Sequence, residues 1–340
     1  MRIRMAPQLT QDQGGEMYRR RFVAVISGAL AAPRLVLGQP SAMHRVAWLS
    51  LPSKVGAEVN FGSFVAGMAA LGYQDGKNLI LDARYGDDSR EMLERRALEA
   101  ASLKPAVFVT HGPGLAIVRK FAEETPVVFL YSGNPVMLGV AKSFGRPGGH
   151  YTGVTLMSHE LAGKRIELLV EMFPKVRRLA VLTNPEHAGD AEEFEATRAA
   201  AARFHLEVSH YRVTNAVEVE RALAAVAAAG AEAMLMNPDS LFTRQGGAIA
   251  RFSIGHRIPA VSGWASFADV GNLISYGPNQ RESYGRLAYY TDRVLRGTKP
   301  ADLPIEFPSK LELVVNLKAA RLLGVTVPQA VLLRADRLIE

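Results

Sequence analysis

Small polar residues stand where buried strands of this 340-residue chain are predicted to end. Each follows an apolar run and precedes a glycine, a proline or a predicted helix start. Capping of the next helix explains any one of them. As a set that recurs in both halves of the chain, they predict a ligand cleft between two lobes, because parallel sheets bind ligands beyond the carboxyl ends of their strands. The set is Ser50, Thr110, Ser132, Thr183-Asn184, Asn237 and Ser262.

Four further residues at predicted strand ends could contact a ligand. Asp239 is either the N-cap of the next helix or a carboxylate that faces a ligand ammonium group. His111 lies on a strand-end loop, where it is either a ligand donor or a solvated or capping side chain. Trp264 and Tyr276 are either core aromatics or an aromatic wall of the cleft.

Motifs for catalysis, metals or cofactors are absent from the sequence. It contains no GxxxxGK[ST], no GxSxG and no HExxH, and Gly112-Pro113-Gly114 lacks the third glycine of GxGxxG. With no cysteine, a thiol nucleophile is excluded. The sequence therefore predicts a binding protein that needs no cofactor and no metal. An enzyme on two Rossmann-like lobes is the least supported alternative.

Strands and helices alternate along the chain, which predicts an α/β fold of two doubly wound parallel-sheet lobes with a hinge. The central unit is a buried strand at residues 127–130, followed by a polar turn and a helix that starts at Pro135. Helix N-termini after Thr110 and Ser132 are expected to hold a ligand carboxylate. A capping box of Asp88 and Glu91 is expected to start another helix.

The second half of the chain repeats the first. Residues 178–183 (RLAVLT) match residues 45–50 (RVAWLS) at an offset of 133. The Gly/Pro-rich residues 145–153 predict a crossover or hinge. The N-terminal lobe is predicted to contain residues 44–153 and about 277–300, and the C-terminal lobe residues 154–276 and part of 301–340.

Residues 1–38 predict a cleavable signal peptide, and Met17 is the better start site. Arginines at 19–21 precede the short apolar segment 22–32, which is too short to span a bilayer as a stable anchor. The RRxF arrangement resembles a twin-arginine signal, and the Sec route is the alternative. A buried N-terminal helix is the competing interpretation. Export to the periplasm is therefore expected, with a mature protein that is not embedded in the membrane.

The net charge of +7 does not indicate a nucleic-acid partner. Six arginines against Asp12 and Glu16 give residues 1–40 a net charge of +4, so only +3 remains for the other 300 residues. So small a charge on the residues after 40 is weak support for a polyanionic partner, and we expect no nucleic-acid partner.

Several segments of the chain resemble the ABC-transporter substrate-binding family that includes tryptophan- and tyrosine-type binding proteins. The resemblance extends from about residue 18 to residue 340, and residues 275–324 are its most specific part. It is carried by RRRF, GYQDGKN (72–78), NPVMLGVAKSFGRPGGHYTGVT (134–155), KRIELLVEMFP (164–174), LTNP (182–185), ISYGPN (274–279), GTKPADLPIEFPSKLELVVNLKAARLLG (297–324) and RADRLIE (334–340).

The resemblance implies a type I periplasmic-binding fold with three crossovers between its lobes. It places pocket loops at Ser50, Thr110-His111-Gly112, Ser132-Gly133-Asn134, Asn184-Pro185, Asp239 and Tyr276. Asn134 and His111 depart from the family pattern, in which an aspartate and a small glycine-rich turn are usual. An aromatic or other carboxylic acid is therefore an alternative to an amino acid as the ligand.

These observations predict the solute-binding component of an ABC importer, which delivers a small organic ligand to an inner-membrane ABC permease. A periplasmic ligand-sensing receptor of the same fold is the alternative. A repressor of this fold would need an N-terminal DNA-binding helix-turn-helix, where this chain has the predicted signal peptide.

Overall fold

The structure, a computed structural model, describes residues 43–340 of the chain. The predicted signal peptide at 1–38, with the arginines and Met17, lies outside the described residues.

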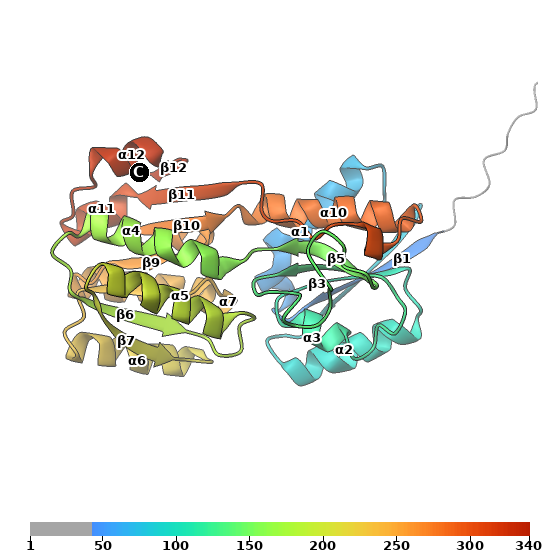
Figure 1. Ribbon diagram of the computed structural model, residues 1–340, viewed down its shortest axis with the longest axis horizontal. Helices are drawn as coiled ribbons and strands as arrows, with labels where there is room; N and C mark the ends of the chain where they lie inside the picture. The colour runs from blue at the N-terminus through green and yellow to red at the C-terminus, as the bar shows by residue number, and fades with distance from the viewer. Residues whose placement is uncertain (1–42) are drawn as a thin grey trace, which may run out of the picture. The chain divides into compact units, whose positions relative to one another are not determined.

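The first lobe, called here the five-stranded lobe, is built on a parallel sheet in the order β2-β1-β3-β4-β5 (Figure 1). Its strands are β1 (His44–Ser50), β2 (Leu79–Tyr85), β3 (Val107–His111), β4 (Val127–Tyr131) and β5 (Tyr151–Thr155). Its helices are α1 (Lys54–Ala70), α2 (Arg90–Ser102), α3 (Gly114–Val118) and α10 (Gln280–Leu295), with the short 3-10 helix η2 (Pro300–Asp302) beside β5.

The seven-stranded lobe has the strand order β12-β11-β10-β9-β8-β6-β7, with β10 and β11 antiparallel and the other pairs parallel. Its strands are β6 (Arg178–Thr183), β7 (Glu207–Arg212), β8 (Ala233–Met236), β9 (Ala260–Ser262), β10 (Ile274–Pro278), β11 (Leu311–Asn316) and β12 (Arg337–Ile339). Its helices are η1 (Ser158–Leu161), α4 (Ala162–Met172), α5 (Asp190–Arg203), α6 (Ala216–Ala228), α7 (Ser240–Arg244), α8 (Gly246–His256), α9 (Ala265–Asp269), α11 (Leu317–Leu323) and α12 (Gln329–Arg334).

Each sheet is covered by helices on both faces. Along β1, Val46 and Trp48 pack under α1 and α10, whereas Ala47 and Leu49 pack under α2 and α3. Successive side chains of a strand point to opposite faces, so a strand between two cores must be apolar throughout. The expected α/β fold with parallel sheets in two lobes is thereby confirmed.

The chain passes between the lobes three times: after β5, between β10 and α10, and between η2 and β11. The late helix α10 therefore packs against α1 in the five-stranded lobe (Figure 1). This return places residues from the C-terminal part of the chain beside residues near the start of the described region.

Two helix starts differ from the sequence predictions. No helix begins at Pro135: the Asn134 side chain accepts hydrogen bonds from the backbone N–H groups of Val136 and Met137, and the segment folds as turns. These are the bonds of a helix N-cap, but the chain leaves helical geometry after one turn at Gly139, where φ is +76°. Helix α2 is capped by Ser89, which accepts from Met92 N, and not by Asp88.

Two strand assignments also differ. Part of the predicted hinge at residues 145–153 belongs to the edge strand β5, where Gly153 has φ +149° and a Cβ atom would lie 2.0 Å from the Phe129 carbonyl oxygen. The short strand β12, which the sequence analysis did not predict, lies beside β11 near the C-terminus.

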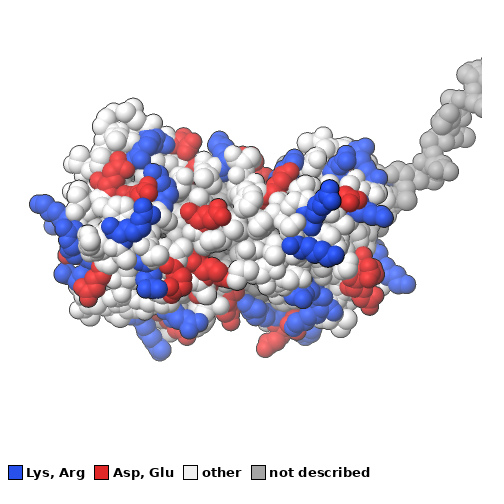
Figure 2. All heavy atoms as spheres, in the orientation of Figure 1, with Lys and Arg blue, Asp and Glu red and all other residues white. Residues whose placement is uncertain are grey.

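Charges of both signs are interspersed over both lobes on the face shown in Figure 2. Among the described residues, no helix has the length and apolar character needed to cross a bilayer.

Candidate functional site

A cavity of about 270 Å³ lies between the two lobes. It is lined from the five-stranded lobe by residues after β1, β3 and β4 and by α10, and from the seven-stranded lobe by residues after β6, β8 and β9. These are the carboxyl ends of parallel strands, where open α/β sheets bind ligands. A volume just under the ~300–1,000 Å³ of typical ligand pockets suits a small organic molecule.

The structure brings six of the fifteen residues predicted for the site to this cavity. His111, Gly112, Ser132, Asn184, Asp239 and Trp264 line it. The remaining nine do not: Ser50, Thr110, Gly133, Asn134, Thr183, Pro185, Asn237, Ser262 and Tyr276.

Local contacts explain where several of these nine side chains lie. Thr110 is fully buried and donates its hydroxyl to the Leu49 carbonyl. Ser50 lies behind His111 and bonds to it. The Asn134 amide oxygen closes its own turn. Tyr276 packs against the core of the seven-stranded lobe, so its ring is no wall of this cavity.

His111 is the main polar group on the wall formed by the five-stranded lobe. Its Nε2 atom lies 2.9 Å from Ser50 Oγ, and its ring packs against Trp48 and Tyr284 at 5.6 and 5.3 Å between centroids. Burial in this aromatic setting lowers the pKa of His111 to about 4, so the imidazole is neutral near pH 7. The wall therefore offers hydrogen bonds without a charge.

Asp239 dominates the opposite wall but is already well bonded. Its Oδ1 accepts from Asn184 Nδ2 at 3.1 Å and from Leu241 N at 2.8 Å, and its Oδ2 lies 3.0 Å from His187 Nδ1. The bond to Leu241 N makes Asp239 the N-cap of α7, as one of the two sequence interpretations held. The structure thus assigns Asp239 a capping and positioning role at this wall.

Asp239 and His187 form a buried ion pair. Burial opposes ionisation of both groups. The hydrogen bond to Asp239 and its negative charge outweigh the effect of burial and raise the pKa of His187. The hydrogen bond from His187 in turn lowers the pKa of Asp239. The pair is therefore close to neutral as a unit.

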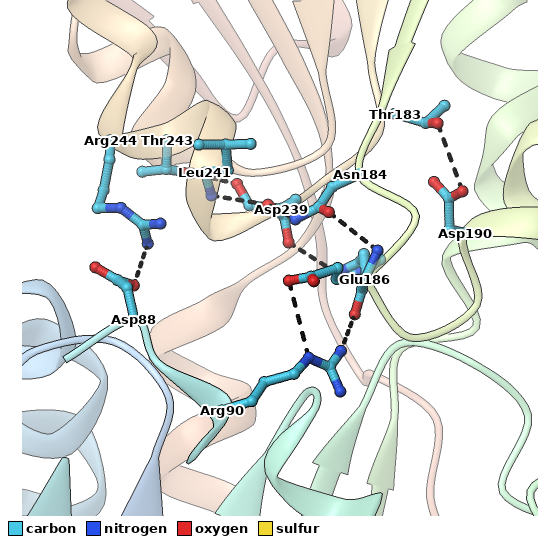
Figure 3. A network of polar contacts seen from close by, with 11 residues as sticks. Asp88, Arg90, Thr183, Asn184, Glu186, Asp190, Asp239, Leu241, Thr243 and Arg244 are labelled. Atoms are coloured by element: carbon cyan, nitrogen blue, oxygen red, sulfur yellow. Dashed lines mark hydrogen bonds and ion pairs between the residues drawn. The ribbon is translucent and has the colours of Figure 1, made fainter. Parts of the chain in front are cut away.

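Two ion pairs connect the lobes at the mouth of the cavity (Figure 3). Arg244 at the end of α7 lies 3.2 Å from Asp88 of the five-stranded lobe. Arg90 donates to the Glu186 carbonyl at 2.9 Å and lies 3.8 Å from its carboxylate. We call these two contacts the mouth pairs. They can form only while the lobes are close together, so they stabilise a closed cleft.

Replacing Arg244 with glutamine is expected to weaken ligand binding about two- to fivefold, because a partly exposed ion pair of the closed form is lost. The loss should shrink in high salt. Calorimetric titration at two salt concentrations measures it. The matched control is Lys164→Gln, which removes an exposed pair with Glu167 inside α4. Equal effects of the two variants would contradict a role for Arg244 in closure.

A cluster of buried charges lies behind the Asp239 wall. Arg165 Nη1 is 2.6 Å from Glu193 Oε1, and both side chains are almost fully buried. Arg165 also donates to the carbonyl oxygens of Tyr276 and Ser158, which border two of the interlobe crossings. Sequence reasoning missed this cluster, because its members come from separate segments and each alone resembles a surface charge.

Asp190, at the start of α5, belongs to the same cluster. Burial raises the pKa of the Asp190 carboxyl to about 6, and the negative charge of Glu193 adds to the increase. The hydrogen bond from Thr183 and the charges of His187 and Arg212 act in the opposite direction and lower the pKa. Its Oδ1 atom is sealed from solvent and has no hydrogen-bond partner among the described residues.

The Asp190→Asn variant is expected to melt roughly 2–5 °C higher than the wild type at pH 8. A raised carboxyl pKa means that the contribution of Asp190 to stability is full below about pH 4 and is lost as the pH rises through about 6. Asparagine avoids that loss, so the difference should vanish at pH 4. Thermal melts across this range measure it, and a difference that stays constant with pH would contradict the assignment.

Sequence reasoning also missed other residues that line the cavity, among them His187, Thr243, Arg244 and Tyr284. No strand-end signal marks Tyr284, which lies inside α10. No group of three or more His, Cys, Asp or Glu residues within 43–340 is arranged to hold a metal ion.

A family model described as ABC transporter substrate binding protein matches residues 52–339. A tyrosine-binding protein of Clostridioides difficile is 19% identical over 254 residues, which cover 74% of this chain and 73% of that protein.

Two solved structures share the fold at a TM-score of 0.81. One, a complex of an ABC domain with L-Trp from Streptococcus pneumoniae, is 21% identical and covers 88% of this chain and 100% of its own. The other, a conserved domain protein from Vibrio cholerae, is 23% identical and covers 87% of this chain and 99% of its own.

Proposed function

Because the chain belongs to the ABC transporter substrate-binding protein family, we propose that it binds a small organic ligand between its two lobes and delivers it to an inner-membrane ABC permease. The observation that carries this proposal is the cavity lined by strand ends of both lobes. A ligand held from both sides stabilises the closed form over the open one, which is how hinge closure couples to binding. No chemical step is required.

The proposed ligand is an amino acid or an aromatic or other carboxylate. The cavity combines apolar side chains, including Leu130, Leu156 and Trp264, with a few hydrogen-bonding groups. The relatives named for tyrosine and crystallised with L-Trp support a ligand of this size and character. The proposed location is the periplasm, reached through the predicted signal peptide.

A thermal-shift screen of the full chain tests the proposal. The panel contains amino acids, aromatic acids, short dicarboxylates, branched acids and, as the contrasting class, sugars. A ligand that binds only the folded state adds about 2.7 kcal/mol of stability at a hundred times its Kd. At least one acid or amino acid should raise the melting temperature. If no compound does so, and mass spectrometry finds no co-purified ligand, the proposal is wrong.

A further inference from the structure

We propose, on the basis of the proposed function, that the ligand is a non-amino carboxylate. Its carboxylate would be held by uncharged donors of His111, Ser132 and Tyr284, and the cavity would offer an ammonium group no free partner. Of the ligand classes named under the proposed function, amino acids are thereby excluded.

The hydrogen bond to Ser50 fixes which nitrogen of His111 carries the proton. Ser50 is fully buried, and Nε2 of His111 is the one hydrogen-bond partner of its hydroxyl among the described residues. If Nε2 carried the proton, the Ser50 O–H would be left buried and unpaired, which is unfavourable. The favoured arrangement has Ser50 donating to Nε2 and Nδ1 protonated.

The Nδ1–H group of His111 is then a donor for the cavity. This N–H group makes no hydrogen bond to a described residue. It is not one of the unpaired polar atoms that are sealed from solvent, so it is accessible. Since His111 lines the cavity, its free N–H is available to a ligand. Because the imidazole is neutral, it donates without adding a charge.

Two hydroxyl groups of the same wall are also free. Ser132 and Tyr284 line the cavity and are 6% and 4% exposed, yet neither hydroxyl bonds to a described residue. Neither oxygen is among the sealed atoms, so both face accessible space. Three donors on one wall match the acceptor oxygens of a carboxylate, to which each hydrogen bond is charge-assisted.

An ammonium group finds no comparable partner. Asn184, Leu241 and His187 already occupy the Asp239 carboxylate, so it offers a ligand ammonium little free hydrogen-bonding capacity. The other carboxylates that line the cavity, Asp88 and Glu186, face arginines in the mouth pairs.

Four probes that share a phenyl body test this inference by calorimetry on the full chain: 3-phenylpropanoate, L-phenylalanine, 2-phenylethylamine and 3-phenylpropanamide. We expect 3-phenylpropanoate to bind at least about tenfold more tightly than each of the others, because only it pairs all three donors with an anion and buries no ammonium. Tighter binding of L-phenylalanine, or equal binding of the amide, would overturn the inference.

A pair of tyrosine variants on α10 localises the effect. Tyr284→Phe removes one free hydroxyl and should weaken 3-phenylpropanoate about tenfold. Tyr289→Phe removes a hydroxyl that does not line the cavity and should leave the affinity unchanged. Equal affinities of the two variants would contradict the assigned donor.

The thermal-shift screen distinguishes a failure of the carboxylate inference from a failure of the proposed binding function. If the screen finds that amino acids bind and that no non-amino carboxylate does, the carboxylate inference is wrong and the binding function stands. If nothing binds at all, both fail.

Discussion

Replacing Arg165 with alanine is expected to lower the free energy of unfolding by about 3–5 kcal/mol, because it leaves the Glu193 carboxylate buried without its partner. Burial already raises the pKa of Glu193, even beside the guanidinium group. The variant also loses the hydrogen bonds to the Tyr276 and Ser158 carbonyls, at the borders of two crossings between the lobes. Urea unfolding with the slope checked for two-state behaviour measures the change.

Two further variants separate the buried charge from a loss of packing. The double variant Arg165→Met with Glu193→Leu removes both charges and should recover much of the stability, since apolar replacement of a buried pair is often neutral. Arg198→Ala removes an exposed pair with Glu195 on α5 and should change stability little. If Arg165→Ala is as mild as Arg198→Ala, the buried pair does not support the fold as described.

Replacing Gly133 with valine is expected to weaken ligand binding about 10- to 100-fold, by holding the lobes apart. A Cβ atom at Gly133 would lie 3.1 Å from the backbone nitrogen and 3.2 Å from the Cα of Gly189, across the interface between the lobes. Gly189 has φ +85° and would place its own Cβ 2.8 Å from the Gly133 Cα. The contact therefore requires glycine on both sides.

The control for Gly133→Val is Gly145→Val, because a Cβ at Gly145 meets nothing within 4 Å. Calorimetry with whichever ligand the screen identifies gives the affinities, and thermal melts without ligand show whether both variants fold. Unchanged affinity in a folded Gly133→Val protein would contradict closure through this contact.

The repeated strands and helices follow from local patterns, and the sequence predicts them closely. A continuous apolar run rich in β-branched and aromatic residues, such as residues 127–130, indicates a buried strand, and Asn215 starts α6 through its own side-chain cap. The helix expected at Pro135 does not form because the capped turn after Asn134 ends at Gly139, where φ is +76°. Strand β5 was missed because a glycine-rich edge strand has no clear pattern of its own.

The site is harder to predict, because its residues meet only in the folded chain. Strand-end reasoning finds His111 and Asp239, since parallel strands bring their carboxyl ends together. It cannot find Tyr284, which reaches the cavity because α10 returns to the five-stranded lobe. Nor can it pair Asp88 with Arg244, because the contact depends on how two lobes meet.

Closure of the two lobes on a ligand is the central claim, and a distance between the lobes tests it most directly. The chain contains no cysteine, so Leu98→Cys on α2 and Val217→Cys on α6 can be labelled selectively at exposed positions of opposite lobes. Single-molecule energy transfer then follows the separation as ligand is added. Closure predicts a shift toward one short distance at saturating ligand, whereas a distribution that ligand leaves unchanged would rule out closure on the ligand.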